Sequence, residues 1–131
     1  TGVFSASLSL QRRTRFDSHV KLLIGEQLFL ASQTVVELRF GALVAGWGDA
    51  RRLRLESAMA ATTIVSVSDE LMDEAAHLRF ECRQLGHPLA AEAHAADLWI
   101  AATARYVDAV LITADRIFTG VPGIEVEPQG P

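Results

Sequence analysis

Apolar positions along the chain follow two different periods, and their alternation predicts strands interleaved with helices. Short apolar or β-branched runs, typical of buried parallel strands, occupy residues 28–31, 63–67, 109–113 and 124–126. Apolar residues at helical spacing cover residues 3–10, 16–24, 32–46, 49–61, 68–86 and 95–106. A short turn is expected at 115–118 and a loop at 127–131. Strands alternating with helices indicate a parallel sheet covered by helices on both faces.

Two serines are candidates for helix N-caps. Ser32 precedes one helical stretch, and Ser68 precedes another whose first turn holds Asp69 and Glu70. Negative charge in a first turn is stabilised by the positive end of the helix dipole. We expect Gly86, followed closely by a proline, to end the second of these helices.

Composition restricts the class of protein. A chain of 131 residues with 50% apolar residues and a formal charge of −4 is typical of one folded domain, here residues 1–131. The single cysteine cannot form an intramolecular disulfide, and no apolar run reaches the roughly 18 residues of a membrane span. We therefore expect a cytoplasmic protein without a membrane partner. The acidic balance argues mildly against a nucleic-acid partner, but an enzyme can meet phosphate through bound cations.

Three acidic residues are placed by chain order at one edge of the predicted sheet. Glu37 lies in the helix that follows the first strand, and Asp97 lies near the start of the helix that leads into the 109–113 strand. Asp115 follows that strand. The functional crevice of such sheets lies beyond the carboxyl ends of the strands, so these carboxylates can converge there. Their apolar neighbours make burial costly unless an arginine or a divalent cation such as Mg²⁺ compensates the charge.

Each acid also has a structural interpretation. Glu37 could pair with Arg39 or Arg105. Asp97 could be a stabilising acid at a helix N-terminus, and Asp115 could cap the turn that follows it. Taken singly, these structural roles are the commoner explanation, and only the three acids together make a metal site competitive.

Four segments carry recognisable motifs: TGVF at 1–4, TVVELRFGA at 34–42, DLWIAATA at 97–104 and LITADRIF at 111–118. Together they resemble the motifs of PIN-domain ribonucleases, most closely the toxins of bacterial VapBC toxin–antitoxin pairs. The segment VPGIEV at 121–126 is also similar to the closing strand of those toxins. The resemblance therefore covers the chain from end to end.

The resemblance implies a three-layer α/β/α sandwich with a parallel sheet and the activity of a Mg²⁺- or Mn²⁺-dependent endoribonuclease. It maps the acidic catalytic and metal-binding residues of the family onto Glu37, Asp97 and Asp115, with the hydroxyls of Thr1 and Thr113 beside them. It also implies an RNA substrate, a homodimer and a cognate antitoxin. An antitoxin arginine at the carboxylates would replace the cation as charge compensation.

The chain departs from the family pattern at its start. The first motif of the family begins with an aspartate at the end of a central strand, and this chain begins at Thr1, one residue after that position. A sheet without that strand would have a gap with unpaired backbone groups on both sides. We therefore expect the natural protein to have an N-terminal strand that ends in Asp, and a polypeptide without it not to cleave RNA.

Arginines supply candidate contacts for a partner. The candidates for RNA phosphates or a protein partner are Arg12, Arg13, Arg15 and Arg116. A second cluster, Arg51, Arg52 and Arg54, could likewise guide RNA phosphates, or could equally contact an antitoxin or a dimer partner. A solvated face is the commoner explanation for such clusters.

Three other functions compete with the nuclease. A phosphoacceptor receiver domain and a haloacid-dehalogenase-like phosphatase each need a lysine late in the chain, and the one lysine is Lys21. A non-catalytic PIN-like module that acts through protein contacts remains the alternative. The presence of all three acids argues against it, because a chain that has lost activity usually loses such costly acids as well.

Overall fold

The computed structural model describes residues 29–127, and its helices and strands alternate as the periodicity predicts. The elements in chain order are β1 (Phe29–Ala31), α3 (Ser32–Val44), α4 (Asp49–Ala60), β2 (Thr63–Val65), α5 (Asp69–Leu85), the 3₁₀ turns η2 (Pro88–Ala90) and η3 (Glu92–His94), α6 (Ala95–Tyr106), β3 (Leu111–Ile112), the 3₁₀ turn η4 (Arg116–Phe118) and β4 (Val126–Glu127). The helices expected at 3–10 and 16–24 lie outside the described residues, as do Thr1, Arg12, Arg13 and Arg15.

The four described strands form two parallel pairs, which confirms the predicted strand direction. In the first pair, β1 and β2 align Phe29 with Thr63. In the second, β3 and β4 align Leu111 with Val126. Within residues 29–127 the two pairs are not hydrogen-bonded to each other, so these strands alone do not form the continuous sheet that the pattern predicts.

The ends of two strands differ from the predicted ends, because turns and hydrogen bonds between strands determine where the strands begin and end. The last strand was expected at 124–126 and is found one to two residues later, at Val126–Glu127. Gly123 turns the chain with a φ of 76°, which delays the start of this strand. The amide of Thr113 then donates to the carbonyl of Glu127 at 2.9 Å, so a residue predicted to lie in a loop is paired. The strand expected at 63–67 ends at Val65.

The two serine predictions have opposite outcomes. Ser68 caps α5 as expected, because its side chain accepts a hydrogen bond from the amide of Leu71 at 3.1 Å. Ser32 does not cap α3. It is the first residue inside the helix, and its hydroxyl donates to the carbonyl of Val65 at 2.8 Å, which ties α3 to the end of β2. Gly86 ends α5 with a φ of 71°, as predicted.

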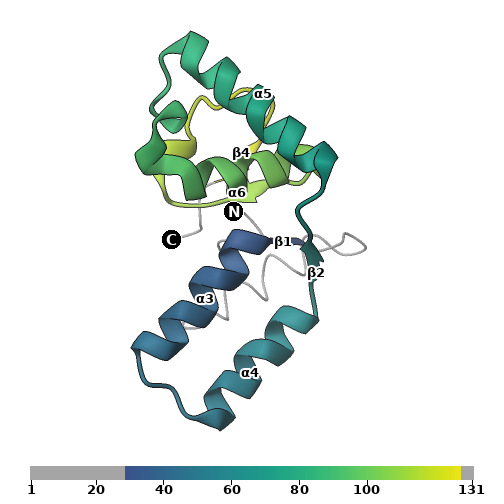
Figure 1. Ribbon diagram of the computed structural model, residues 1–131, viewed down its shortest axis with the longest axis vertical. Helices are drawn as coiled ribbons and strands as arrows, with labels where there is room; N and C mark the ends of the chain where they lie inside the picture. The colour runs from purple at the N-terminus through teal and green to yellow at the C-terminus, as the bar shows by residue number, and fades with distance from the viewer. Residues whose placement is uncertain (1–28, 128–131) are drawn as a thin grey trace.

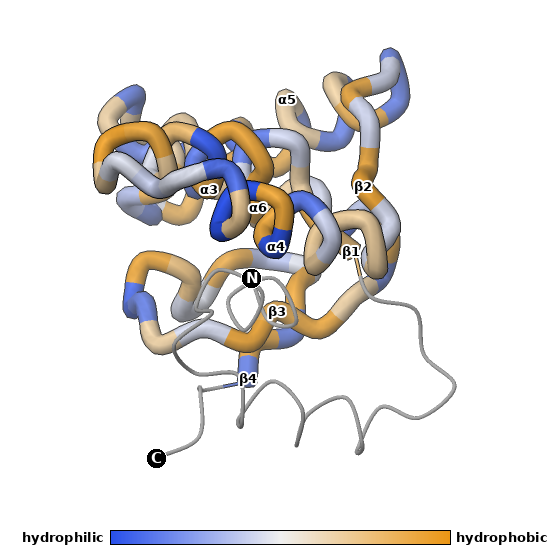
Figure 2. Tube along the Cα trace, turned by 90° about the horizontal axis from the view of Figure 1, so that it is seen from below, coloured by the Kyte–Doolittle hydropathy of each residue, from blue (hydrophilic) through white to orange (hydrophobic). Residues whose placement is uncertain are grey.

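The helices are arranged in two groups, as Figure 1 shows: α5 and α6 lie side by side at one end, and α3 and α4 extend from the strands at the other. The alanines of α6 at 101, 102 and 104 are fully buried, so α5 can approach this helix closely. Leu78 and Cys82 of α5 are also fully buried. The strands β2 and β3 lie in hydrophobic stretches of the chain (Figure 2).

Candidate functional site

The three predicted acids lie on three different elements, in the order that the sequence predicts. Glu37 is in the second turn of α3, directly after β1. Asp97 is in the first turn of α6. Asp115 follows β3 and precedes η4. Each carboxylate is therefore held by an element that begins just beyond a strand or leads into one.

Glu37 is exposed, and both arginines considered as its partners are engaged elsewhere. Arg39 forms a two-point contact with Glu56, with distances of 2.7 and 3.1 Å. Arg105 bonds to two glutamates of α5. Within residues 29–127 the carboxylate of Glu37 has no hydrogen-bond or ion-pair partner, so the pairing expected with Arg39 or Arg105 is not formed. No polar group of the described residues occupies its oxygens.

Asp97 occupies the structural position that its alternative interpretation describes. It lies at the positive end of the α6 dipole, and its side chain is 32% exposed. A titratable group close to it is His94, whose Nδ1 is 3.4 Å from Oδ2 of Asp97. This distance is too long for a strong hydrogen bond, so the histidine neighbours the carboxylate without fixing it.

Asp115 caps the turn that follows it, as its structural interpretation predicts. Its Oδ1 accepts a hydrogen bond from the amide of Ile117 at 3.0 Å. The hydroxyl of Thr113 accepts from the amide of Asp115, also at 3.0 Å, and Thr113 itself is 8% exposed. The buried threonine therefore fixes the backbone of the acid. Arg116 is exposed beside it, and Thr113, Asp115 and Arg116 line one open pocket.

Glu37 and Asp115 are exposed, so these two carboxylates avoid the cost of burial that their apolar neighbours in the sequence would impose. Of the two valines before Glu37, Val35 enters the core and Val36 is exposed. Within residues 29–127 no three histidine, cysteine or acidic side chains lie close enough together to hold a metal ion. Carboxylate oxygens are the donors that Mg²⁺ prefers, so the donors fit the cation chemically, but the described residues present them separately.

Sequence reasoning missed one buried hydroxyl beside Glu37. Thr34 lies one helical turn before it, is fully buried, and has no hydrogen-bond partner for its Oγ1 among residues 29–127. A buried hydroxyl without a partner is uncommon. Its spacing from Glu37 was visible in the motif, but nothing in the sequence distinguishes this threonine from a bonded one such as Thr103, which donates to the carbonyl of Trp99 at 2.7 Å.

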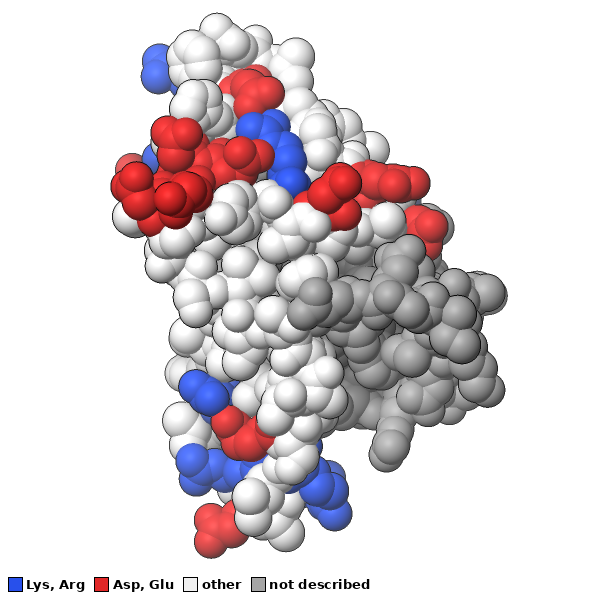
Figure 3. Space-filling model, turned by 90° about the vertical axis from the view of Figure 1, so that its right-hand side faces the viewer, with Lys and Arg blue, Asp and Glu red and all other residues white. Residues whose placement is uncertain are grey.

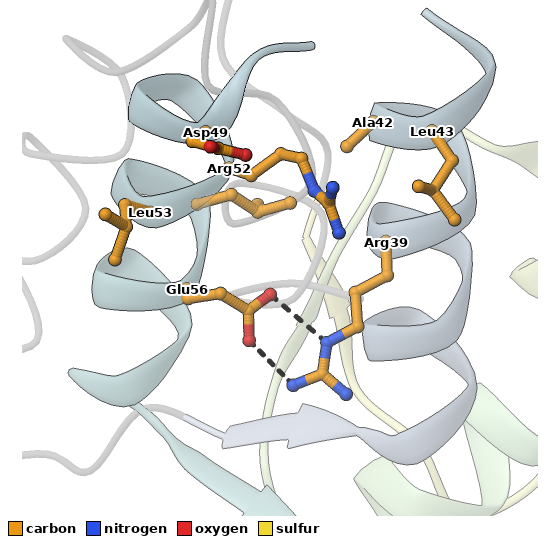
Figure 4. Close-up of a pocket in the computed structure, with 8 residues that line it drawn as sticks. Arg39, Ala42, Leu43, Asp49, Arg52, Leu53 and Glu56 are labelled. Atoms are coloured by element: carbon orange, nitrogen blue, oxygen red, sulfur yellow. Dashed lines mark hydrogen bonds and ion pairs between the residues drawn. The ribbon is translucent and has the colours of Figure 1, made fainter. Parts of the chain in front are cut away.

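A second surface lies between α3 and α4. The two helices enclose an open groove of about 630 Å³, bridged by the contact between Arg39 and Glu56 (Figure 4). The Arg39 guanidinium lowers the pKa of Glu56 below its usual value. Exposed apolar side chains on these helices are Val36, Phe40, Leu43, Val44 and Leu53.

Charge is distributed unevenly over the face shown in Figure 3, where acidic side chains gather at the end that holds α5 and arginines at the end that holds α3 and α4. The three arginines of residues 51–54 are exposed on α4. The guanidinium of Arg51 lies over the ring of Trp47, 5.1 Å from its centroid.

Among residues 29–127, no helix has both the length and the apolar character needed to cross a membrane.

Comparison with known proteins identifies a family and solved structures of similar fold. The family model described as PIN domain matches residues 1–124. A crystal structure of VapBC2 from Rickettsia felis, bound to a DNA fragment from their promoter, has a TM-score of 0.79 at 19% identity, with 98% of this chain and 94% of that chain covered. A DNA-bound VapBC from Salmonella typhimurium has a TM-score of 0.67 at 23% identity, with 93% and 86% covered. No curated protein matches the chain significantly.

Proposed function

The chain belongs to the PIN-domain family, and from this premise we propose that it is the nuclease toxin of a toxin–antitoxin pair, an endoribonuclease that depends on Mg²⁺ or Mn²⁺. The observation that carries the proposal is Glu37. This acid of the second motif is exposed, and it has no structural partner within residues 29–127. Asp97 and Asp115 keep their motif positions at the start of α6 and after β3.

Glu37, Asp97 and Asp115 would hold the cation, which in such sites lowers the pKa of water and stabilises negative charge on a phosphate. Thr113 holds the backbone of Asp115 in place through its hydroxyl. Arg116, exposed next to Asp115, offers a positive charge to an RNA phosphate.

A cognate antitoxin is the proposed protein partner. Both structural neighbours are VapBC complexes bound to DNA. In this chain the exposed apolar side chains of α3 and α4 and the arginines of residues 51–54 supply a surface that suits a protein partner. Dimer formation is a further proposal, for which this same surface is available.

A non-catalytic PIN-like module is the second candidate. It is favoured by one observation: residues 29–127 contain no cluster of three side chains that could hold a metal ion. A module of this kind would act through protein contacts and would need no cation.

The test uses the full-length natural protein with Mn²⁺ and total RNA. We expect Mn²⁺ to raise the melting temperature and to support RNA cleavage, and we expect Glu37→Gln and Asp97→Asn to abolish both effects. Asp49→Asn is the matched control, because Asp49 is also a first-turn acid of a 12-residue helix. Sequencing the RNA ends identifies the substrate.

Each outcome separates the candidates. Cleavage by Asp97→Asn at near the original rate would show that the site assignment is wrong. A wild-type protein that neither binds Mn²⁺ nor cleaves RNA, but binds an antitoxin, would favour the non-catalytic module.

A further inference from the structure

A histidine from a distant part of the chain holds the loop that carries Asp115. His87 lies between α5 and η2 and is half-buried. Its Nε2 lies 2.7 Å from the carbonyl oxygen of Thr119, a residue 32 positions further along the chain. Its Nδ1 accepts a hydrogen bond from the amide of Leu89 at 3.0 Å. The ring therefore joins the end of α5 to the loop after η4.

The two contacts determine which nitrogen of the imidazole carries a hydrogen. A backbone amide can only donate, so the Nδ1 that faces Leu89 carries no hydrogen. A carbonyl oxygen can only accept, so the Nε2 that faces Thr119 carries one. Only the neutral ring with its hydrogen on Nε2 satisfies both partners, because a second hydrogen on Nδ1 would oppose the amide of Leu89.

Short-range hydrogen bonds organise the loop held by His87, the side chain of Phe118 is buried in the core, and further along the carbonyl of Pro122 accepts from Arg105 of α6. The amide of Thr119 donates to the carbonyl of Arg116 at 3.0 Å, and the amide of Ile117 donates to Asp115 Oδ1 at the same distance. The amide of Asp115 donates to the hydroxyl of Thr113. The short-range bonds define the shape of the loop, and the bond from His87 attaches its Thr119 end to the α5–η2 segment.

We propose that His87 is a positioning residue for the candidate site, which sets the place of the Asp115 carboxylate through the carbonyl of Thr119 and the turn η4. The part of this inference that concerns catalysis rests on the proposed function. The part that concerns the loop does not, because it follows from the hydrogen bonds alone.

Two substitutions separate the contacts of the ring. In His87→Asn the shorter side chain can still accept from the amide of Leu89, as asparagine does at helix N-caps, but it cannot reach Thr119. In His87→Ala both contacts are lost. The control is His77→Asn, because His77 is an exposed histidine of α5 whose polar contacts within residues 29–127 are with Asp73 of the same helix.

Amide hydrogen exchange in the native protein measures the attachment. We expect His87→Asn to speed exchange at Ile117 and Thr119 by about five- to tenfold, the effect of one lost hydrogen bond, and to leave Leu89 unchanged. His87→Ala should speed all three amides, and His77→Asn none. Unchanged exchange at Ile117 and Thr119 in His87→Asn overturns the proposal. In the wild type, long-range ¹H–¹⁵N spectra of the ring should show a protonated Nε2, and the reverse tautomer also overturns it.

The catalytic arm measures RNA cleavage by the full-length protein across a Mn²⁺ titration. We expect His87→Asn to raise the Mn²⁺ concentration at half-maximal rate by about tenfold, with most of the rate restored at saturating Mn²⁺. Substitution of residues that orient a metal ligand without touching the metal typically lowers metal affinity in this way. Equal midpoints in His87→Asn and wild type overturn the positioning role. Absence of cleavage in the wild type refutes the proposed function, and the exchange experiment then decides the inference by itself.

Discussion

Replacing Arg105 by methionine should destabilise the fold by breaking the link between α5, α6 and the turn before β4. Arg105 lies in the last turn of α6, and its side chain is 16% exposed. Its Nε contacts Glu74, and its Nη2 donates to Glu81 at 2.7 Å. Its Nη1 also donates to the carbonyl of Pro122 at 3.3 Å. Methionine keeps much of the apolar volume of the stem and removes all three polar contacts.

The size of the stability loss in Arg105→Met depends on how exposed the two glutamates are. A hydrogen bond to a charged group contributes about 1.5–3 kcal/mol when buried, and an exposed ion pair about 0–1 kcal/mol. The side chains of Glu74 and Glu81 are 29% and 42% exposed, so both carboxylates are hydrated again when the arginine is removed. The more exposed pair, between Arg105 and Glu81, therefore contributes little to stability. We expect Arg105→Met to cost about 2–3 kcal/mol, which for a chain of this length lowers the melting temperature by roughly 6–12 °C.

Urea unfolding followed by circular dichroism measures the free energy of unfolding of both proteins. Arg83→Met is the matched control, because Arg83 is an exposed arginine in the last turn of α5 without a side-chain partner in the described part of the chain, and it should change stability by less than about 0.5 kcal/mol. A loss in Arg105→Met no larger than in Arg83→Met would refute the reasoning.

The pH dependence provides an independent check. The hydrogen bond from Arg105 lowers the pKa of Glu81 below its usual value. A carboxyl with a lowered folded pKa stabilises the protein above the unfolded pKa of about 4.3, and this contribution is lost as the pH falls through the folded pKa. The difference in free energy of unfolding between wild type and Arg105→Met should therefore become smaller as the pH falls below about 4. A constant difference from pH 7 to pH 3 would contradict the assignment of the ion pair.

Two further predictions concern the same half of the molecule. Gly123→Ala should cost about 1–2 kcal/mol in left-handed backbone strain and more from a clash, since an added Cβ would lie 2.7 Å from Cδ of Arg105. Gly120→Ala carries the same strain with its nearest contact at 4.0 Å, so urea unfolding should show a smaller loss for it; equal losses would exclude the clash. Cys82 is fully buried, and burial raises the pKa of its thiol, so a thiol reagent should react with it only after unfolding, and rapid reaction in the native protein would contradict this.

Periodicity predicted the alternation of helices and strands because it reports which face of each element is buried. It could not predict element ends that distant contacts decide. Ser32 has the residue type and position of an N-cap, but its hydroxyl finds the carbonyl of Val65, 33 residues later. The last strand moves to include Glu127 because the amide of Thr113 needs an acceptor at that level of the ladder.

In the candidate site, too, local features could be predicted from the sequence and contacts between distant residues could not. The motif positions of Asp97 and Asp115 predicted their elements correctly, and the cap made by Asp115 is a local contact that sequence can suggest. The partners of Arg39 could not be predicted, since a long side chain selects among acids that folding brings near it, and here folding brings Glu56. His87 was missed for a related reason, because its partner Thr119 is distant in sequence.

These contacts also determine which acid tests the proposed function most directly. A substitution at Asp115 disturbs the cap of η4, and one at Asp97 alters charge at a helix N-terminus, so lost activity in either has a structural explanation. Glu37 is exposed and has no polar partner in the described part of the chain, so Glu37→Gln removes a charge and little else. If activity depends on Glu37 while stability does not, we infer that the carboxylate acts on the cation or the RNA, because the described part of the chain gives it no structural role that would explain the loss.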